Sequence, residues 1–340
     1  MTSPSNRAVS ISIVKTNVLA VWAALLSALV LISLLGMALG AVPLSLGEVI
    51  TALGGGENAF IVLEYRMPRV LVSIMAGAAF ALSGALLQNA LRNPIASPDV
   101  IGITKGAGLG ALTAVILLPP AWSIWAIPAG IAIGSTLALF LLLAIGQRLG
   151  GSVTTMALVG VALGALAQAI THFLMATYPA KSDQAMLWLA GTVFGSSGHD
   201  VLWLALWLLI CLPIVVLISN LLDLTGFGDD NLSSLGINPR WARACLIVVA
   251  VALVAGAVAS VGSVGFLGLL APQIAKALVS QRARYLLPTS ALVGALLLSV
   301  ADLTGRLIAL PNEIPAGIVS AVIGGPYLLY LLYREARSNG

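Results

Sequence analysis

Charged side chains are scarce in this sequence. Asp, Glu, Lys and Arg make up 8% of its 340 residues, against roughly 25% in a soluble globular domain. Hydrophobic residues make up 60%, and the mean hydropathy is +1.07. A soluble protein of this length could not cover such a chain with polar surface, so lipid must be the solvent for most of it.

Cysteine and histidine are almost missing too. The chain has two cysteines, Cys211 and Cys245, each inside an apolar run, and two histidines, His172 and His199. Two thiols in separate apolar runs are not a disulfide framework, so we expect them to serve in packing or to face lipid. No cluster of Cys and His suggests a metal site, and we expect the chain to bind no metal.

Catalytic and nucleotide-binding motifs are absent as well. The sequence has no G-x-x-x-x-G-K-[ST] loop, no H-E-x-x-H, no G-x-S-x-G and no Rossmann fingerprint. Ionisable residues within the apolar runs are nearly absent, although an ion-coupled carrier usually needs them there. We expect no enzyme activity and no bound cofactor in this chain. If it belongs to a pump, ATP and Mg²⁺ are used by a separate subunit.

Long apolar runs make up most of the chain. A spanning helix needs about 20 mostly apolar residues, and unbroken runs do not fit the alternating pattern of a membrane barrel. The uncharged stretch 244–275 is too long for one span, and Gly262, Gly265 and Gly268 divide it. We predict an all-α, polytopic membrane protein of about ten transmembrane helices, at 18–40, 68–90, 100–118, 121–146, 154–176, 200–221, 242–262, 267–281, 287–310 and 314–333.

The first run needs a separate argument. Arg7 and Lys15 precede Val18–Leu39, an arrangement that resembles a secretory signal. This run is longer than the hydrophobic region of a signal, which has about 7–15 residues. We interpret it as a retained first helix, with a cleaved signal as the alternative.

Lysines and arginines predict the orientation. With the N-terminus inside and ten alternating helices, twelve cations fall inside and four outside, as expected of a multi-pass protein of the bacterial inner membrane. The net charge of +4 therefore reflects orientation and not nucleic-acid binding. Residues 1–17 and 334–340 become cytoplasmic tails of a membrane domain, 18–333. The inside cations are Arg7, Lys15, Arg92, Lys105, Arg148, Arg240, Arg243, Lys276, Arg282, Arg284, Arg334 and Arg337, and the outside ones are Arg66, Arg69, Lys181 and Arg306.

Small residues recur at four-residue spacing in several runs. This spacing lets helix backbones approach closely, so we expect a compact bundle. The positions are Ser73, Gly77, Ala81 and Ala85, then Gly106 and Gly110, then Gly160 and Gly164.

Two polar segments lie near helix ends. Tyr65–Arg69 places Pro68, which suits the first turn of a helix, between two arginines on the outer side. Gln88–Asp99 is an inner turn in which Pro94 and Pro98 stop a helix. Its aspartate suits the start of the next helix. Ordinary helix-end contacts explain the first segment, and a tight turn explains the second.

The third polar segment is the inner loop Leu222–Arg243. It carries three aspartates and the pair Leu235-Gly236. Its length and amphipathic character suit a docking surface for a soluble partner, and a disordered connector is the alternative. We expect short helices over Asp229–Trp241, because glycine at 236 allows a tight corner at positive φ.

These segments, taken in order, resemble the integral permease family of ATP-driven importers for iron–siderophore, haem and cobalamin. The resemblance covers the chain from about Glu64 to its C-terminus. The variant Arg-Asn-Pro-x-Ala-Ser-Pro-Asp looks most like members that serve ferric citrate and other ferric siderophores. The residues that carry the resemblance are Arg66-Met67-Pro68-Arg69, Gly77-Ala78, Ser83-Gly84, Gln88, Arg92-Asn93-Pro94-Ile95-Ala96-Ser97-Pro98, Leu187-Trp188-Leu189-Ala190-Gly191, Leu235-Gly236, Gly265-Phe266-Leu267-Gly268-Leu269, Pro272, Leu287-Pro288, Ala301-Asp302, Arg306 and Glu313-Ile314-Pro315-Ala316-Gly317.

The resemblance implies partners and roles. Two permease chains, as a homodimer or a heterodimer, would form the pathway, two cytoplasmic ATP-binding subunits would power it, and an extracytoplasmic binding protein would deliver the substrate. Carboxylates of that protein would dock on Arg66, Arg69 and Arg306. The ATPase would contact the inner loop at Asp229, Asp230, Leu235, Gly236 and Arg240. The remaining family residues, interpreted as structural, are Arg92, Asn93, Pro94, Pro98, Gly265, Gly268, Pro272, Asp302, Glu313 and Pro315.

The outer arginines also allow a second interpretation. Arg306 could pair with Asp302, four residues earlier, and Arg66 could pair with Glu64. Those internal pairs would leave Arg69 the freest of the three.

The sequence departs from the family pattern in two places. Where the family usually has Pro-His-x-x-Arg, this chain has Pro272-Gln273 and then Lys276, so the histidine is gone and a cation remains. The usual Gly-Ala-Pro is Gly324-Gly325-Pro326 here. The first departure puts any role of that histidine in doubt.

The sequence therefore predicts a permease subunit that forms the translocation pathway for a ferric siderophore-type chelate and catalyses no reaction itself. Haem or cobalamin is the alternative cargo. The rival class is an ion-coupled secondary carrier or channel, which the missing intramembrane charges disfavour.

The predicted topology can be tested by thiol labelling from outside intact cells. Single cysteines near Glu57 and Lys181 should react, and cysteines at Arg148 and Arg284 should not, because the twelve-to-four cation bias places them on opposite sides. Labelling of position 284 from outside would contradict the ten-helix arrangement.

Overall fold

The structure is a computed structural model that describes residues 17–119, 122–179, 186, 188–226, 228–310 and 312–338. Within these residues all regular structure is helical. The elements are α1 (Val18–Ala38), α2 (Leu46–Leu53), the π-helical η1 (Ile61–Arg66), α3 (Met67–Ala90), α4 (Ile103–Leu117), α5 (Ser123–Arg148), α6 (Val153–Thr177), α8 (Gly198–Leu217), α9 (Ser219–Thr225), α10 (Asp229–Ser234), α11 (Pro239–Val261), α12 (Leu267–Leu278), α13 (Ala283–Ile308) and α14 (Ala316–Ser338).

Seven of the described helices are long and apolar enough to cross a membrane: α1, η1 with α3, α5, α6, α8, α11 and α13. Three more apolar helices are shorter, namely α4, α12 and the part of α14 up to Tyr330. Each of the ten predicted ranges coincides with one of these helices, so the prediction of the apolar helices is confirmed. With a rise of about 1.5 Å per residue, α12 is only about 18 Å long.

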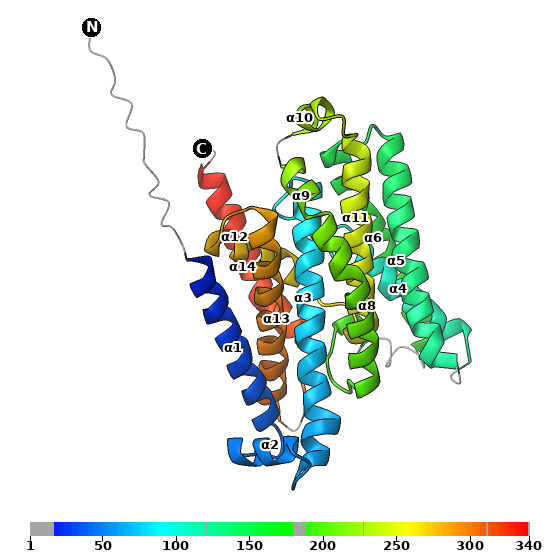
Figure 1. Cartoon of the computed structure of the whole chain (residues 1–340). Helices are drawn as coiled ribbons and strands as arrows, with labels where there is room; N and C mark the ends of the chain where they lie inside the picture. The colour runs from blue at the N-terminus through cyan, green and yellow to red at the C-terminus, as the bar shows by residue number, and fades with distance from the viewer. Residues whose placement is uncertain are drawn as a thin grey trace.

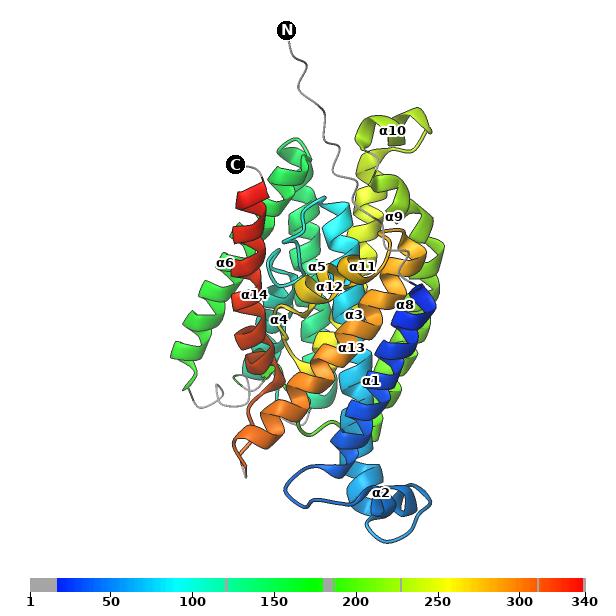
Figure 2. The same ribbon diagram turned by 90° about the vertical axis from the view of Figure 1, so that its left-hand side faces the viewer.

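The helices lie side by side as a bundle around α3 (Figure 1). α3 packs against α11, α12 and α13, and it is buried along most of its length. α4, α5 and α6 pack on one another at one side of the bundle, and α1 packs against α13 at the other. Figure 2 shows that the start of α1 and the last turn of α14 point toward the end that carries α9 and α10, whereas α2 covers the opposite end.

Glycine permits the closest helix contacts. A Cβ added at Gly77 would lie 2.3 Å from the carbonyl oxygen of Gly294, and one at Gly84 would lie 1.7 Å from that of Gly268. Gly110 meets Gly130 in the same way between α4 and α5. The spacing of small residues thus predicts the Gly77 contact that joins α3 to α13 and the Gly110 contact that joins α4 to α5, whereas Gly84 lies outside that spacing.

The α11–α12 break confirms the division of the long uncharged stretch. Gly262 ends α11 at φ 71°, where a Cβ would lie 2.1 Å from the carbonyl oxygen of Trp188. Phe266 then precedes α12 at φ 65°, a left-handed conformation that is unusual for a bulky residue. The break is buried against the segment after Trp188, since the Ser263 amide donates to the Trp188 carbonyl at 3.2 Å.

Several boundaries differ from the prediction, among them the starts of α11 and α13 and the end of α12. The second helix begins at Ile61, because a π-helical turn accommodates Pro68, whose ring would otherwise clash with the preceding turn. The sixth apolar helix ends at Leu217, and the residues after it form the separate α9. α14 continues to Ser338, past the predicted boundary at 333. The predicted tail 1–17 lies, except for Asn17, outside the described residues, as does Lys181.

α2 is an element that sequence reasoning missed. Its signal was the capping box formed by Ser45 and Glu48. The Ser45 hydroxyl and amide both donate to the Glu48 carboxylate, at 2.6 and 2.7 Å, and they lower its pKa below the usual value. Val49 and Ala52 are the buried residues on the inner face of α2.

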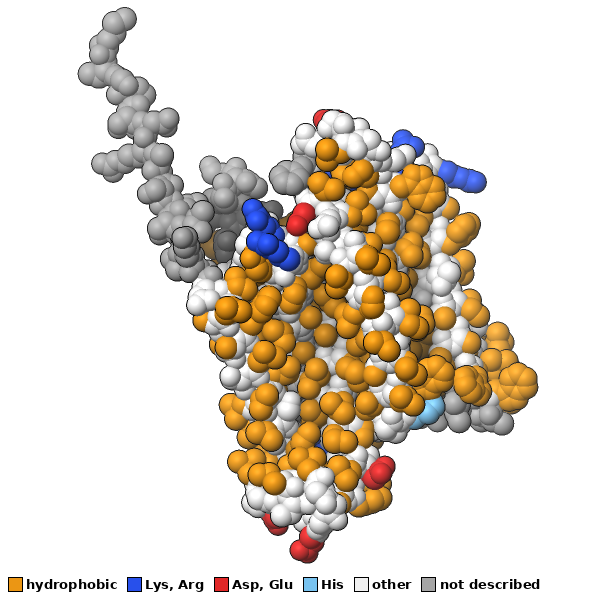
Figure 3. Space-filling view, viewed as in Figure 1, with side chains coloured by type: hydrophobic (Ala, Val, Ile, Leu, Met, Phe, Trp, Pro, Cys, Tyr) orange, Lys and Arg blue, Asp and Glu red, His pale blue; other side chains and the backbone are white. Residues whose placement is uncertain are grey.

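The surface carries an apolar belt between two polar ends (Figure 3). In this view the large patches of lysine and arginine lie in the half toward α10, whereas carboxylates appear at both ends. The cations of the α2 end, Arg66, Arg69 and Arg306, are instead buried. This distribution agrees with an α10 end in the cytoplasm.

Candidate functional site

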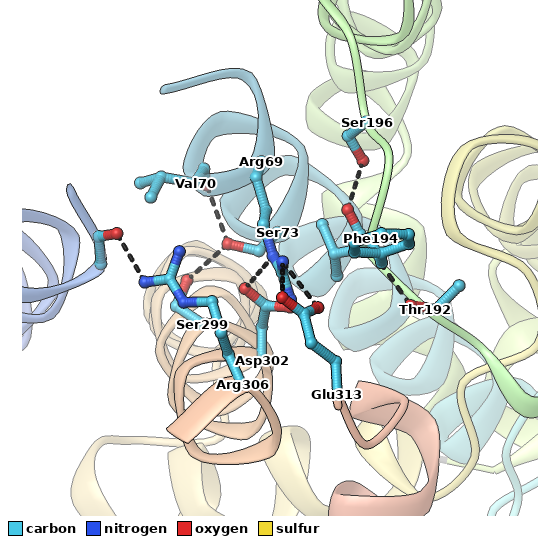
Figure 4. Close-up of polar contacts among 12 residues, drawn as sticks. Arg69, Val70, Ser73, Thr192, Phe194, Ser196, Ser299, Asp302, Arg306 and Glu313 are labelled. Carbon is cyan, nitrogen blue, oxygen red and sulfur yellow. Dashed lines mark hydrogen bonds and ion pairs between the residues drawn. The ribbon is translucent and has the colours of Figure 1, made fainter. Parts of the chain in front are cut away.

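Five charged residues meet at the α2 end of the bundle, and we call them the outer charge cluster. Arg66 ends η1, Arg69 lies in the first turn of α3, Asp302 and Arg306 lie in the last turns of α13, and Glu313 lies in the segment before α14. Figure 4 labels Arg69, Asp302, Arg306 and Glu313. All three arginines are buried, with 7%, 8% and 6% of their surface exposed. The cluster joins elements that are far apart in the sequence.

Arg69 is the centre of this cluster. Its Nε donates to both oxygens of Asp302, at 3.0 and 2.9 Å, and its Nη2 donates to Oδ1 at 2.7 Å. Its Nη1 lies 2.8 and 3.1 Å from the two oxygens of Glu313, and its guanidinium lies 5.9 Å from the centre of the Phe194 ring. The planar fork of arginine suits such two-sided pairing.

Arg66 and Arg306 donate hydrogen bonds to the last carbonyls of α1. Arg66 Nη1 donates to the Met37 and Ala38 carbonyls at 2.6 and 3.0 Å, and Arg306 Nη2 donates to the Gly36 carbonyl at 2.6 Å. The last carbonyls of a helix lack partners within it, and cations there are favoured by the helix dipole. α1 has no basic residue in its own last turn, so η1 and α13 supply the donors.

These contacts correct the internal pairs expected from the sequence. Asp302 pairs with Arg69 instead of Arg306, because the Arg306 guanidinium is directed at α1. Among the described residues no ion pair joins Arg66 to Glu64, which is exposed. The expectation that Arg69 is the freest arginine is wrong, since it is the most extensively paired.

A second set of charged contacts lies at the α10 end. Asp229 Oδ1 accepts from Arg92 Nη2 at 2.6 Å, and its Oδ2 accepts from Arg243 Nη2 at 3.0 Å. Arg92 Nε also donates to the Thr225 carbonyl at 3.0 Å, and Arg243 Nη1 donates to the Gly151 carbonyl at 2.8 Å. Asp229 thereby fastens α10 to the loop after α3 and to α11.

The predicted coupling residues divide into two groups. Asp229 faces the protein, whereas Asp230, Leu235, Gly236 and Arg240 are exposed at the tip of the loop. The tip is a tight corner at Gly236, whose φ of 77° matches the expected left-handed conformation. Of the expected short helices one is present, as α10, whereas residues 239–241 begin the long helix α11.

The inner turn after α3 is held by its own polar groups. Arg92 adopts a left-handed φ of 42°, and Asn93 Oδ1 accepts from the Ile95 amide at 2.9 Å. The Pro98 carbonyl accepts from the Ile103 amide at 3.0 Å, and Asp99 Oδ1 accepts from the Thr104 hydroxyl at 3.1 Å. Asp99 thus contacts the first turn of α4.

The family departures at 273 and 276 form a polar contact in this structure. Gln273 Nε2 donates to Gln88 Oε1 and to the Pro94 carbonyl, both at 2.9 Å, and Lys276 Nζ donates to Gln88 Oε1 at 3.0 Å. An amide and an ammonium therefore join α12 to the inner end of α3 without a histidine.

The other family residues lie in close backbone contacts. The Gly265 carbonyl accepts from the Ser320 hydroxyl at 3.1 Å, and Gly268 lies against Gly84 and Pro98. Pro272 is buried within α12. The Pro315 carbonyl accepts from the Ile318 amide at 3.0 Å in the first turn of α14.

These observations define a class of protein. The charged side chains that contact one another lie at the two ends of an apolar bundle. Among the residues described, no group of three or more His, Cys, Asp or Glu side chains could hold a metal ion. The fold is that of a multi-span membrane protein whose paired charged side chains lie at its two polar ends.

The chain belongs to the FecCD transport family, which it matches over residues 25–334. It is 46% identical over 313 residues to the Fe(3+)-citrate import system permease protein YfmE of Bacillus subtilis, covering 92% of this chain and 94% of that protein. It is 35% identical over 303 residues to the Fe(3+) dicitrate transport system permease protein FecD of Escherichia coli, covering 89% and 94%. The family resemblance inferred from the sequence is thus confirmed, and the chain is a permease subunit of an importer.

Solved structures agree with the fold. A transporter assigned as a metal-chelate type ABC transporter, in an inward-facing conformation, superposes with a TM-score of 0.83 at 27% identity, covering 93% of this chain and 99% of that chain. PsaBC from Streptococcus pneumoniae, in complex with Fab, shares the fold with a TM-score of 0.58 at 16% identity, covering 84% and 95%.

The buried Arg69–Asp302 pair predicts a specific pattern of stability. Asp302→Asn should destabilise the purified protein, by up to about 3–5 kcal/mol, because the buried Arg69 guanidinium then keeps only the partly exposed Glu313 as its counter-charge. The measurement is thermal unfolding in detergent, with exposed Glu64→Gln as the matched control. Replacing both partners, as Arg69→Met with Asp302→Leu, should cost less than Asp302→Asn alone. A double variant at least as unstable as Asp302→Asn would contradict this account.

Proposed function

We propose that this chain forms one half of the translocation pathway for a ferric siderophore-type chelate, of which ferric citrate is the leading candidate. The observation that carries the proposal is the match along almost the full chain to two permeases named for ferric citrate. Two copies, or this chain and a related one, enclose the pathway. Two cytoplasmic ATPases drive it, and an extracytoplasmic binding protein delivers the chelate.

The proposed topology has ten crossings with both termini in the cytoplasm. It is supported by the common direction of the α1 start and the α14 end (Figure 1) and by the cations at the α10 end. The shorter α4 and α12 cross within the bundle, where they contact other helices instead of lipid along much of their length. Irregular backbone at membrane depth is tolerated when protein surrounds it.

The cargo can be tested by uptake into proteoliposomes that contain the permease, its ATPases and its binding protein. Radiolabelled ferric citrate should accumulate only when ATP is supplied on the side of the membrane that carries the ATPases. Haem and cobalamin should not accumulate under the same conditions. A supply of ATP without the ATPase subunits should give no uptake, because this chain has no P-loop. Accumulation of haem or cobalamin in preference to iron chelates would replace the proposed cargo, and uptake driven by an ion gradient alone would favour a secondary carrier.

The tip of the inner loop is the proposed contact for the ATPase. Leu235 has 61% and Trp241 has 76% of its surface exposed, on either side of the corner at Gly236. Asp229 is not free to contact the partner while it is paired with Arg92 and Arg243. We therefore assign Asp229 to holding the tip in place, and assign Asp230, Leu235, Gly236 and Arg240 to the contact itself.

Gly236 gives a test of this contact. No atom lies within 4 Å of a Cβ added there, so a large side chain would meet the partner and not this chain. Gly236→Trp should leave membrane insertion unchanged and abolish most uptake while ATP hydrolysis continues. Gly236→Asn is the matched control, because it bears the same positive φ with little bulk and asparagine tolerates that conformation. Equal uptake by the two variants would remove the assignment.

The outer charge cluster is the proposed contact for the binding protein. It lies at the end opposite to the inner loop (Figure 1), and complementary charge across an interface steers encounter and fixes orientation. Burial limits how much of Arg66, Arg69 and Arg306 a partner can reach. Access is best at Arg69, beside the half-exposed Glu313 and the exposed Phe194.

A further inference from the structure

The outer charge cluster has more positive than negative charge. It contains three guanidinium groups and two carboxylates, Asp302 and Glu313, and both carboxylates are paired with Arg69. Among the described residues, no carboxylate lies within 4 Å of Arg66 or Arg306, which donate only to backbone carbonyls. The Arg306 Nε is buried and has no hydrogen-bond partner. A buried cation without a counter-charge is unfavourable, so the cluster favours an anionic partner at its exposed side.

Glu313 is the member that can be displaced most easily. Its side chain is 25% exposed, against 8% for Asp302. Asp302 lies on α13 and takes two nitrogens of Arg69, whereas Glu313 lies outside a helix and contacts only Nη1. The pair with the more exposed carboxylate is screened more by solvent, so the Glu313 pair is the weaker of the two. Figure 4 shows the two carboxylates on adjacent sides of the same guanidinium.

We propose that Glu313 is an internal stand-in for a carboxylate of the binding protein. When the binding protein docks, its carboxylate takes the Arg69 Nη1 position and Glu313 is released. The inference rests on the proposed docking at this end. It explains how an arginine that is buried in the free chain can still bind a partner. The partner's carboxylate replaces one internal carboxylate, and the Arg69–Asp302 pair stays intact.

The exchange also links docking to α14. Glu313 lies three residues before Ala316, the first residue of α14. The same segment is held by the Ile314 amide on the Gly305 carbonyl at 3.0 Å and by the Gly317 amide on the Gly191 carbonyl at 2.8 Å. Release of Glu313 removes the only described ion pair of this segment, so the start of α14 is less tightly held when the partner is bound.

The sign of the effect separates this inference from simple docking. If Glu313 competes with the partner, Glu313→Gln should strengthen binding, because glutamine pairs less strongly with Arg69. The expected gain is about two- to fivefold, the range for a partly exposed ion pair. Removing any negative charge near the interface would also help an acidic partner slightly, so the gain must exceed that of the control.

The experiment measures the affinity of the fluorescently labelled binding protein, without chelate, for the full transporter in nanodiscs at low and high salt. Glu64→Gln is the matched control, since Glu64 is exposed on η1 and makes no described ion pair. Arg69→Lys is the second variant. It keeps a cation for Asp302 and loses the fork that reaches Glu313, so a folding failure is avoided and the Glu313 effect should vanish.

The outcomes are distinct. A gain for Glu313→Gln that exceeds the gain for Glu64→Gln, and that is absent in the Arg69→Lys background, supports the stand-in role. An equal or smaller gain overturns that role, and the docking proposal stands if Arg69→Lys still weakens binding. Binding that is insensitive to salt, to Arg69→Lys and to Glu313→Gln removes the docking proposal and the inference with it.

Discussion

The absence of water in the hydrocarbon layer is the constraint on which the rest of this structure depends. A backbone amide or carbonyl there must find a hydrogen-bond partner in the protein. The non-helical residues after Trp188 and those at the α11–α12 break bond to each other. The Thr192 amide donates to the Val261 carbonyl at 2.8 Å, and the Ser263 amide donates to the Trp188 carbonyl at 3.2 Å. Because these segments are paired and buried, α11 and α12 can be separate helices inside the bundle.

The same constraint decides where the charges lie. Arg66 of η1 and Arg306 of α13 donate to the last carbonyls of α1, and two carboxylates pair with Arg69 beside them. At the other end, Asp229 joins α10 to two arginines of the bundle. The protein therefore has one charged cluster at each end, and each lies beside the surface that we assign to a partner. A partner can act on either cluster without entering the apolar interior.

The polar contact at the inner end of α12 shows how the family pattern can change without losing its connection. Gln273 and Lys276 stand where the family usually has histidine and arginine, and both donate to Gln88. Gln273 also reaches the Pro94 carbonyl in the inner turn. The link between α12, α3 and that turn needs donors at these two positions, which glutamine and lysine provide.

The sequence alone determined the class of protein, the apolar helices, the split at Gly262 and the family, because apolar runs and glycine breaks are local signals. The corner at Gly236 was also predictable, since only its own φ is involved. The pairing of the outer arginines was not. Arg69 finds Asp302 at a separation of 233 residues, and Arg306 finds a carbonyl of α1 at a separation of 270. Sequence spacing favours partners one helical turn away, such as Asp302 for Arg306, but the packing of α1, α3 and α13 decides which way each guanidinium points.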